Sequence, residues 1–161
     1  MTIAVGAKLP EATLLAMGEK GPEQVALAAR LAGRKVVIFG LPGAYTGTCT
    51  SAHVPSFIRT KGQFDAKGVD EIICVSVNDP FVMKAWGEAT GASAAGITML
   101  ADSDAGFTKA LELTFDLPQF GFFARSKRYS LLAEDGLVTR FNPEAGPGCE
   151  ISAGEHLLSQ I

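Results

Sequence analysis

A lone cysteine, Cys49, stands in the segment GLPGAYTGTCTSAHVPSF, which spans residues 40–57. The apolar run KVVIFG leads into this segment and a helical pattern follows, so we expect Cys49 at the first turn of a helix that leaves the carboxyl end of a strand. Unpaired N–H groups and the positive end of the helix dipole meet at such a point. They favour the thiolate, which is the nucleophilic form of cysteine. The sequence therefore predicts a nucleophile at Cys49.

A fast nucleophile also needs neighbouring groups that orient the electrophile and stabilise the developing charge. One well-placed donor can contribute roughly 2.7–4 kcal/mol to such a reaction. Thr46 lies three residues before Cys49 on the same turn, and its hydroxyl can both donate and accept. A cation is expected from the segment ARSKRYS, in which composition does not distinguish Arg125 from Arg128.

Two buried strands joined by a helix must position these residues. The runs 36–39 and 72–77 are short, continuous and rich in β-branched residues, which is typical of strands covered on both faces. Helical spacing of apolar residues predicts a crossover helix over about 50–66, with a disturbed first turn at Pro55. The segment 36–77 is therefore predicted to be a right-handed βαβ unit.

The rest of the chain completes an α/β fold. Cap residues and apolar periodicity predict a helix, a strand, a second helix, a hairpin and a closing helix, over 79–91, 97–100, 104–113, 128–141 and 152–161. Asp79 is the expected N-cap of the first helix, and Asp135-Gly136 the turn of the hairpin. Ser152 and Glu155 have capping-box spacing. We expect a single domain, residues 1–161, with a mixed central sheet and helices on both faces.

Composition excludes several functional classes. Of the 161 residues, 47% are hydrophobic and 19% are charged, with a net charge of −3 and without a block of like charges. This balance predicts a packed core, and neither nucleic acid nor a membrane surface is an expected partner. The N-terminal segment shows neither a leader pattern nor a transmembrane run, so we expect a cytoplasmic protein. Three cysteines do not make the framework of a secreted domain, and thiols that start free permit catalysis.

Several segments together resemble one family. They are FGLPGAYTGTC followed by SAHVPSF, VNDPFVMKAW, RSKRYSLL, EDG, and EISAGEHLLSQI at the end of the chain. In this order they are similar to the peroxiredoxins, and most of all to the Prx5 or type II branch. The resemblance implies a thioredoxin-like fold and an antioxidant thiol peroxidase of cell redox homeostasis. Such an enzyme reduces hydrogen peroxide and small alkyl hydroperoxides through a cysteine sulfenic acid.

The resemblance also assigns residues. Cys49 matches the peroxidatic cysteine, and Thr46 matches the threonine that hydrogen-bonds the sulfur and the peroxide. Arg128 matches the arginine that helps to hold the thiolate and polarise the O–O bond, and Pro42 matches the proline that shields the pocket. The family likeness further implies a homodimer without metal or flavin, recycled by an external thiol reductant, either glutathione with glutaredoxin or thioredoxin.

Some positions depart from the family pattern. Gly47 stands where proline is usual, and Ser56 stands where glycine is usual. Phe122 and Phe123 follow Gly121 where a more glycine-rich turn is typical. The change at Gly47 removes a restraint on φ close to the nucleophile. Phe120, Phe122 and Phe123 form an aromatic cluster, for which a pocket rim and a dimer contact both remain open.

Three routes are open for resolving the sulfenic acid. Cys74, 25 residues after Cys49, has a spacing that resembles type II members with a resolving cysteine, although its place in IICVSV equally fits an inert core residue. A Cys49–Cys74 disulfide would require the first helical turn to unwind. Cys149 resembles the region of a C-terminal resolving thiol, and an incidental thiol is the alternative. The third route uses glutathione or a glutaredoxin directly.

Other functions also fit Cys49 when it is considered alone. A non-catalytic thioredoxin-fold sensor or binding module would use the same sulfenic acid as a signal. A cysteine hydrolase would need a histidine base, and neither histidine has an evident orienting acid. His53, four residues after Cys49, suggests either a zinc pair or a histidine on the helix surface or beside the site.

Overall fold

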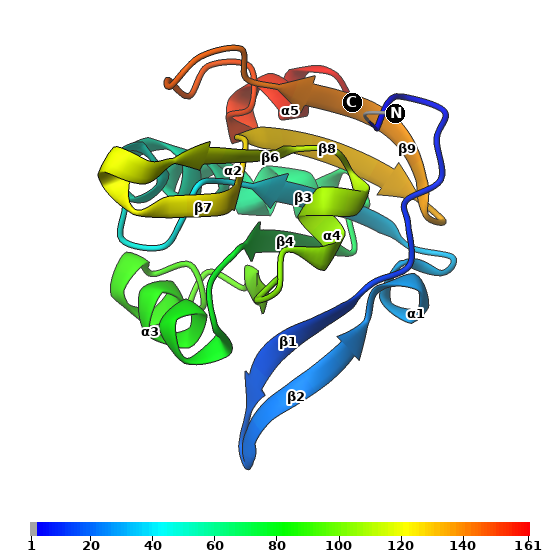
Figure 1. Ribbon diagram of the computed structural model, residues 1–161. Coiled ribbons are helices and arrows are strands. Elements are labelled where there is room, and N and C mark those ends of the chain that lie inside the picture. The colour runs from blue at the N-terminus through cyan, green and yellow to red at the C-terminus, as the bar shows by residue number, and fades with distance from the viewer. Residues whose placement is uncertain (1–2) are drawn as a thin grey trace.

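The computed structural model describes residues 3–161, which form a seven-stranded mixed sheet in the order β2-β1-β5-β4-β3-β8-β9 (Figure 1). The strands are β1 (Thr13–Gly18), β2 (Gly21–Ala26), β3 (Lys35–Gly40), β4 (Glu71–Ser76), β5 (Thr98–Ala101), β8 (Tyr129–Glu134) and β9 (Leu137–Pro143). β3, β4 and β5 are parallel, and β8 pairs antiparallel with β3. A separate hairpin consists of β6 (Thr114–Leu117) and β7 (Phe122–Ser126), joined by the short helix η2 (Pro118–Phe120).

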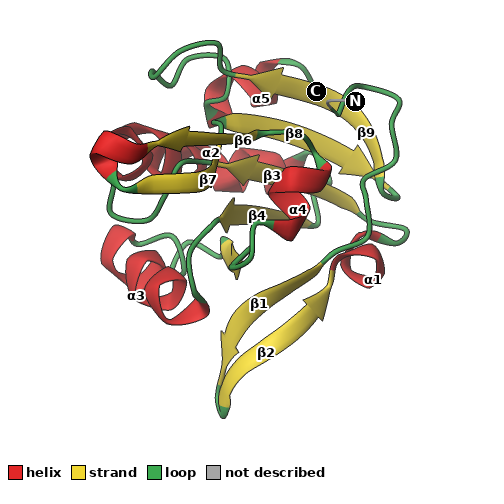
Figure 2. Cartoon of the chain, in the orientation of Figure 1, coloured by secondary structure: helices red, strands yellow, loops and turns green. Residues whose placement is uncertain are grey.

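Helices cover both faces of the sheet (Figure 2). They are α1 (Leu27–Leu31), the π-helical turn η1 (Cys49–His53), α2 (Val54–Ala66), α3 (Pro80–Thr90), α4 (Gly106–Ala110) and α5 (Gly154–Ser159). Side chains of α2, α3 and α5 share one apolar core with Val37 and Phe39, whereas those of α1 and α4 share the other with Val36 and Ile38. β3 is therefore buried on both faces, and the predicted α/β thioredoxin-like architecture is confirmed. Within residues 3–161, none of the helices is both long and apolar enough to cross a membrane.

The predicted βαβ unit is present, with a π-helical turn at the start of its crossover. β3 and β4 are parallel, and Phe39 pairs with Cys74. The N–H of Val54 donates to the carbonyl of Cys49, which is the wider i to i−5 bond of a π-helix. Pro55 follows at the second position of α2. Because a proline ring crowds the carbonyl four residues earlier, the wider turn accommodates it, and this is the disturbance predicted at the start of the helix.

Two local signals gave the expected geometry. Asp79 caps α3, because its carboxylate accepts from the Val82 N–H at 2.8 Å, and Gly91 ends this helix in the left-handed region at φ 83°. Asp135 and Gly136 both have positive φ between β8 and β9, as a type I′ turn requires. The predicted helix and the predicted hairpin are therefore confirmed.

The predicted capping box at the last helix is wrong. The N-cap of α5 is Ala153, whose side chain makes no capping bond. The Ser152 hydroxyl donates instead to the Glu144 carboxylate at 2.5 Å, and Glu155 pairs with Arg59 at 2.8 Å. A carboxylate from a remote part of the chain therefore engages the serine that the local pattern assigned to the cap. The preceding helix, α4, is also shorter than predicted.

Candidate active site

Cys49 is the first residue of η1, and its side chain is only 1% exposed. The Nη2 group of Arg128 donates to its sulfur at 3.2 Å. Strand pairing explains this approach, because Gly40 at the end of β3 pairs with Tyr129 at the start of β8. Arg128 therefore leaves the sheet at the same edge as the loop that carries Cys49. A buried guanidinium at this distance is a charged hydrogen-bond donor to the sulfur and stabilises negative charge that develops during a reaction there.

Arg125, which composition alone did not distinguish from Arg128, has a different position from the arginine that the family resemblance assigned to the site. Its Nη1 group donates to the Pro42 carbonyl at 2.9 Å, and its guanidinium lies over the ring of Phe122 at 4.9 Å from the centroid. A Cβ atom at Gly43 would lie 2.2 Å from this Nη1 group, so glycine leaves the space that the arginine occupies. Arg125 therefore fixes the loop, and Arg128 is the cation at the sulfur.

Thr46 lies on the loop between β3 and η1 and lines a cavity at this site. Its hydroxyl donates to the Gly43 carbonyl at 2.6 Å, and its own carbonyl accepts from the Thr50 N–H at 3.1 Å. Because the hydroxyl proton is engaged with Gly43, the lone pairs of the oxygen remain able to accept a bond from a hydroperoxide O–H.

Asn78 was missed by the sequence analysis. Its side-chain oxygen accepts from the Ala44 N–H at 3.0 Å and from the Ser76 hydroxyl at 2.6 Å. This contact holds the loop before Cys49 against the segment that follows β4. A polar amide directly after a buried parallel strand was the available signal, since the carboxyl ends of neighbouring parallel strands meet at one edge.

His53 is fully buried, and both of its ring nitrogens have partners. Nδ1 lies 3.1 Å from Nη1 of Arg128, and Nε2 lies 3.0 Å from the Ser152 carbonyl. Since a guanidinium can only donate and a carbonyl can only accept, the ring is a neutral imidazole with its proton on Nε2. Burial, followed by the nearby charge of Arg128, lowers the pKa of His53 to about 3. The interpretation of His53 as a helix-surface residue is wrong, whereas the alternative of a histidine beside the site agrees with its contact to Arg128. Neither ring nitrogen is free for zinc or for a hydrolase base.

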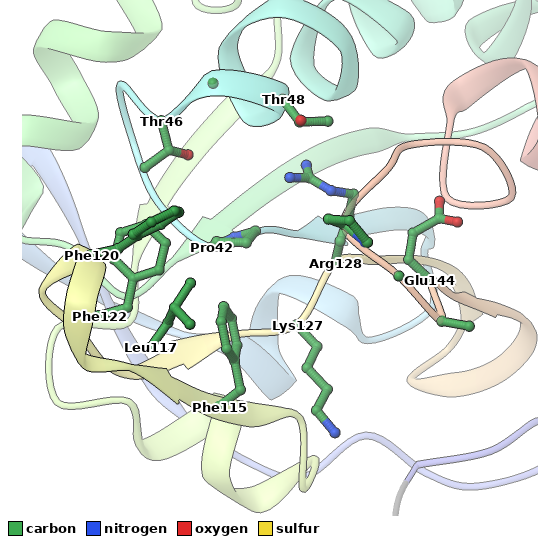
Figure 3. Close-up of a pocket in the computed structure, with 14 residues that line it drawn as sticks. Pro42, Thr46, Thr48, Phe115, Leu117, Phe120, Phe122, Lys127, Arg128 and Glu144 are labelled. Carbon is green, nitrogen blue, oxygen red and sulfur yellow. The ribbon is translucent and has the colours of Figure 1, made fainter.

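A cavity of about 710 Å³ opens beside these residues (Figure 3). Pro42, Thr46 and Arg128 are among the residues that line it and are labelled in the close-up. One wall is apolar and consists of Phe115, Leu117, Phe120 and Phe122, and the opposite wall consists of residues 144–147. Phe120 and Phe122 therefore belong to the rim of the cavity, whereas Phe123 is 64% exposed and does not line it.

The other two cysteines have different environments. Cys74 is fully buried in β4 on the face that packs against α2, in the same core cluster as Cys49. Burial and then the nearby Cys49 sulfur raise the pKa of Cys74 well above its ordinary value. Cys149 is half-buried and accepts a contact from the Ser152 hydroxyl at 3.8 Å, and burial is the main cause that raises its pKa.

Comparison with known proteins agrees with this geometry. The sequence matches the family described as Redoxin over residues 4–158. Peroxiredoxin-2C of rice (Oryza sativa subsp. japonica) is 46% identical over 160 residues, covering 99% of this chain and 98% of that protein. The chain belongs to the peroxiredoxins. A chloroplastic rice relative, peroxiredoxin-2E-2, is also 46% identical, over 99% of this chain and 73% of its own length.

Among solved structures, reduced Prx3 from Vibrio vulnificus in complex with H2O2 has a TM-score of 0.93 and 48% identity, covering 99% of each chain. This peroxiredoxin is therefore a thiol-dependent peroxidase, as the sequence predicted, and relatives named peroxiredoxin-2 agree with the predicted type II branch. The alternative of a non-catalytic module is not favoured. Because relatives include chloroplastic and mitochondrial proteins, the cytoplasmic location remains a prediction.

Two departures from the peroxiredoxin pattern have structural consequences. Ser56 is buried, and its hydroxyl donates to the His53 carbonyl at 2.7 Å and accepts from the Gly154 N–H at 2.9 Å. It therefore links the turn that carries Cys49 to the last helix. Gly47 is exposed within the helical turn before Cys49, and a Cβ atom there would contact nothing within 4 Å.

Proposed function

We propose that Cys49 is the peroxidatic cysteine of this peroxiredoxin and that it reduces hydrogen peroxide and small alkyl hydroperoxides. The observation that carries the proposal is the contact of 3.2 Å between Nη2 of Arg128 and the Cys49 sulfur. Thr46 lies on the same loop with a free acceptor, and Pro42 limits access beside them. The nucleophile therefore lies beside a cation, and this cation and the Thr46 hydroxyl both belong to residues that line a cavity.

The reaction is a displacement at oxygen. The Cys49 thiolate attacks the terminal oxygen of the hydroperoxide, an S–O bond forms, and the O–O bond breaks with its electron pair going to the leaving oxygen. The leaving alkoxide, or hydroxide for hydrogen peroxide, takes up a proton, so that thiol and hydroperoxide become sulfenic acid and alcohol or water. Arg128 stabilises the charge that moves from sulfur to oxygen, and Thr46 orients the hydroperoxide by accepting its O–H.

The shape of the site supports small hydroperoxides. The sulfur is almost completely buried, so only a peroxide end of small cross-section reaches it. The aromatic wall formed by Phe115, Phe120 and Phe122 offers an apolar surface to an alkyl group that remains in the cavity. The Vibrio vulnificus relative was solved with H2O2, which supports the smaller substrate here.

Reducing equivalents then return the sulfenic acid to the thiol. We propose an external thiol reductant, glutathione with glutaredoxin or thioredoxin, which attacks the sulfenic acid to give a mixed disulfide and water. Cys74 and Cys149 are the candidate internal resolving thiols. Cys74 lies in the core beneath α2, so its bond to Cys49 requires η1 to unwind, whereas Cys149 is half-buried and more accessible.

We also propose a homodimer in which exposed aromatic residues near the site form the contact. Tyr45, Phe81, Phe120 and Phe123 are all more than half exposed. The bond between Ala44 and Asn78 brings the segments of Tyr45 and Phe81 together, and the cavity joins Thr46 to Phe120. Exposed apolar residues that gather in one region, as these do, commonly mark an interaction surface. Analytical ultracentrifugation of the wild type and of Phe123→Ser would detect dissociation.

Mass spectrometry after one equivalent of hydrogen peroxide tests the catalytic assignment. The wild type should gain a sulfenic acid at Cys49, trapped by dimedone, or a disulfide that includes it. Cys74→Ser and Cys149→Ser should each retain the first turnover, and Cys49→Ser should abolish it. Rapid first turnover by Cys49→Ser would contradict the proposal, and so would loss of sulfenic acid formation in a folded Cys74→Ser variant.

A further inference from the structure

Four residues from separate parts of the chain form a closed set of hydrogen bonds behind the sulfur. Arg128 donates from Nη1 to Nδ1 of His53, and Nε2–H of His53 donates to the Ser152 carbonyl. The N–H and hydroxyl of Ser152 both donate to the Glu144 carboxylate, at 2.9 and 2.5 Å. The N–H of Glu144 donates to the Arg128 carbonyl at 2.9 Å, which closes the set. We call these four residues the four-residue network.

The network holds one half of the guanidinium while leaving the other half for the sulfur. Nη1 of Arg128 is engaged by the imidazole, and Nη2 of the same planar group points to Cys49. A guanidinium is rigid and flat, so fixing one nitrogen restricts where the other can lie. The direction of Arg128 toward the sulfur is therefore coupled to the position of the His53 ring.

The His53 ring itself has little freedom. Its centroid lies 5.0 Å from that of Phe39 and 5.7 Å from that of Phe57, both of which are core residues. The Ser56 hydroxyl holds the His53 carbonyl, and the Ser152 carbonyl fixes Nε2. A ring packed on two aromatic side chains and bonded at both nitrogens is a well-defined support for its partner.

The absence of charge on this support matters for the sulfur. A carboxylate at the same place would pair with Arg128 and offset the positive potential that the thiolate needs. A neutral imidazole accepts the hydrogen bond and leaves the full charge of the guanidinium facing Cys49. The pKa of His53, lowered to about 3 by burial and by Arg128, keeps the ring neutral throughout the physiological range.

We propose that His53 is a positioning residue of this peroxiredoxin, which directs the guanidinium of Arg128 to the Cys49 sulfur as an uncharged acceptor. The inference rests on the proposed function of Cys49 and adds a residue to it. His53 acts on the sulfur through Arg128, because both of its ring nitrogens are bonded within the network. The network also makes the loop 144–152 part of the support for the active-site cation.

Two substitutions by uncharged residues distinguish the hydrogen bond at Nδ1 of His53 from the hydrogen bond at Nε2. In His53→Asn the amide oxygen lies near the position of Nδ1 and can still accept from Arg128. In His53→Gln the amide group reaches the position of Nε2, which restores the contact to Ser152 but not the acceptor at Nδ1. Measured by stopped flow, the first peroxide turnover should be within about threefold of wild type in His53→Asn and slower by about tenfold to a hundredfold in His53→Gln.

A second measurement, in addition to turnover, distinguishes a role of His53 in positioning Arg128 from a role in core packing alone. The rate of Cys49 alkylation by iodoacetamide, followed across pH, reports the thiolate population. Its profile should move to higher pH in His53→Gln and remain close to wild type in His53→Asn. In an Arg128→Gln background the two substitutions at His53 should become equivalent, because their effect passes through the arginine. Equal rates and profiles for the two single variants would overturn the proposal, and so would unequal effects in the Arg128→Gln background.

NMR of the wild type tests the protonation state of His53 without relying on variants that could fail to fold. The 15N shifts of His53 should show a neutral ring protonated on Nε2 between pH 5 and 8, and a proton on Nδ1 or a charged ring at pH 7 would overturn the inference. Failure of the proposed function would look different. If the wild type itself formed no sulfenic acid at Cys49, the catalytic assignment would be lost while the tautomer of His53 remained as measured.

Discussion

Nη2 of Arg128 and Sγ of Cys49 lie 3.2 Å apart although 79 positions separate the two residues in the chain. The antiparallel pairing of β3 with β8 creates this proximity, since it sets the start of β8 beside the end of β3. Both side chains are buried. Burial reduces screening by solvent, so one charge at this distance acts more strongly on the sulfur than it would at the surface.

Removing the charge of Arg128 should therefore slow the reaction with peroxide. We expect Arg128→Gln to lower the second-order rate constant of the first turnover by about 10²–10³-fold, the usual effect of losing one donor to a developing charge. Stopped-flow measurement with hydrogen peroxide would test this. Arg140→Gln is the matched control, because Arg140 is exposed and its side chain bonds to the main-chain carbonyls of Thr139 and Gln160, away from Cys49. Equal slowing by both variants would argue against a specific role for Arg128.

The sequence predicted the centre of the fold well because its strands are buried on both faces. β3 and β4 form continuous apolar runs, and these runs identified the βαβ unit and hence the place of Cys49. β2 was missed for the opposite reason, and so was its antiparallel partner β1, which has one fully buried residue. β2 lies at the edge of the sheet and is largely exposed, so its sequence, GPEQVA, carries neither an apolar run nor alternation.

Contacts between segments that are far apart in the chain could not be predicted from local sequence patterns. The choice between Arg125 and Arg128 depends on where β7 ends and β8 begins, which local patterns do not define. The hydrogen-bond partners of His53 are 75 and 99 positions away in the chain. The spacing from Cys49 to His53 therefore indicated that the imidazole lies near the cysteine, but it did not indicate which groups the imidazole binds. In the same way, the capping-box pattern covers only residues near Ser152. It gives no sign that Glu144 binds the Ser152 hydroxyl in place of the helix N-terminus.

Trp86 should report unwinding of η1. It is the only tryptophan, it is fully buried, and its indole N–H donates to the Thr50 hydroxyl at 3.1 Å, one residue after Cys49. If Cys74 resolves the sulfenic acid, peroxide should produce a red shift of emission as water reaches the indole. The shift should be absent in Cys74→Ser, and Thr50→Val controls for loss of the hydrogen bond alone. A Cys49–Cys74 disulfide that forms without a change in emission would contradict unwinding.

Two glycines on the same loop should respond in opposite directions to alanine. Gly47 lies in a helical turn with open space around it, so Gly47→Ala should raise the free energy of unfolding by about 0.5–1 kcal/mol. Gly43→Ala places a Cβ atom 2.2 Å from Nη1 of Arg125 and displaces its bond to the Pro42 carbonyl. We expect a loss of about 1 kcal/mol there. Urea unfolding measures the change in the free energy of unfolding for each variant. Changes of the same sign in the two variants would contradict the different roles given to Gly47 and Gly43.

The buried His53 should make the folded state less stable as pH falls. Its pKa is about 3 in the folded protein against an ordinary value of 6.5, so the unfolded chain binds more protons between these two values. The contribution of the neutral ring is complete above pH 6.5 and is lost progressively as pH falls toward 3. At pH 5 the loss should be about 2 kcal/mol relative to pH 7.

Urea unfolding of the wild type and of His53→Asn at several pH values between 7 and 5 isolates this contribution, because the carboxylates titrate alike in both proteins. The free energy of unfolding of the variant should fall less steeply, by about the amount expected for one histidine. His156, the other histidine of the chain, lies on α5 outside the four-residue network, and His156→Asn controls for the loss of a histidine as such. Parallel pH curves for the wild type and His53→Asn would mean that the ring is not held neutral by burial beside Arg128.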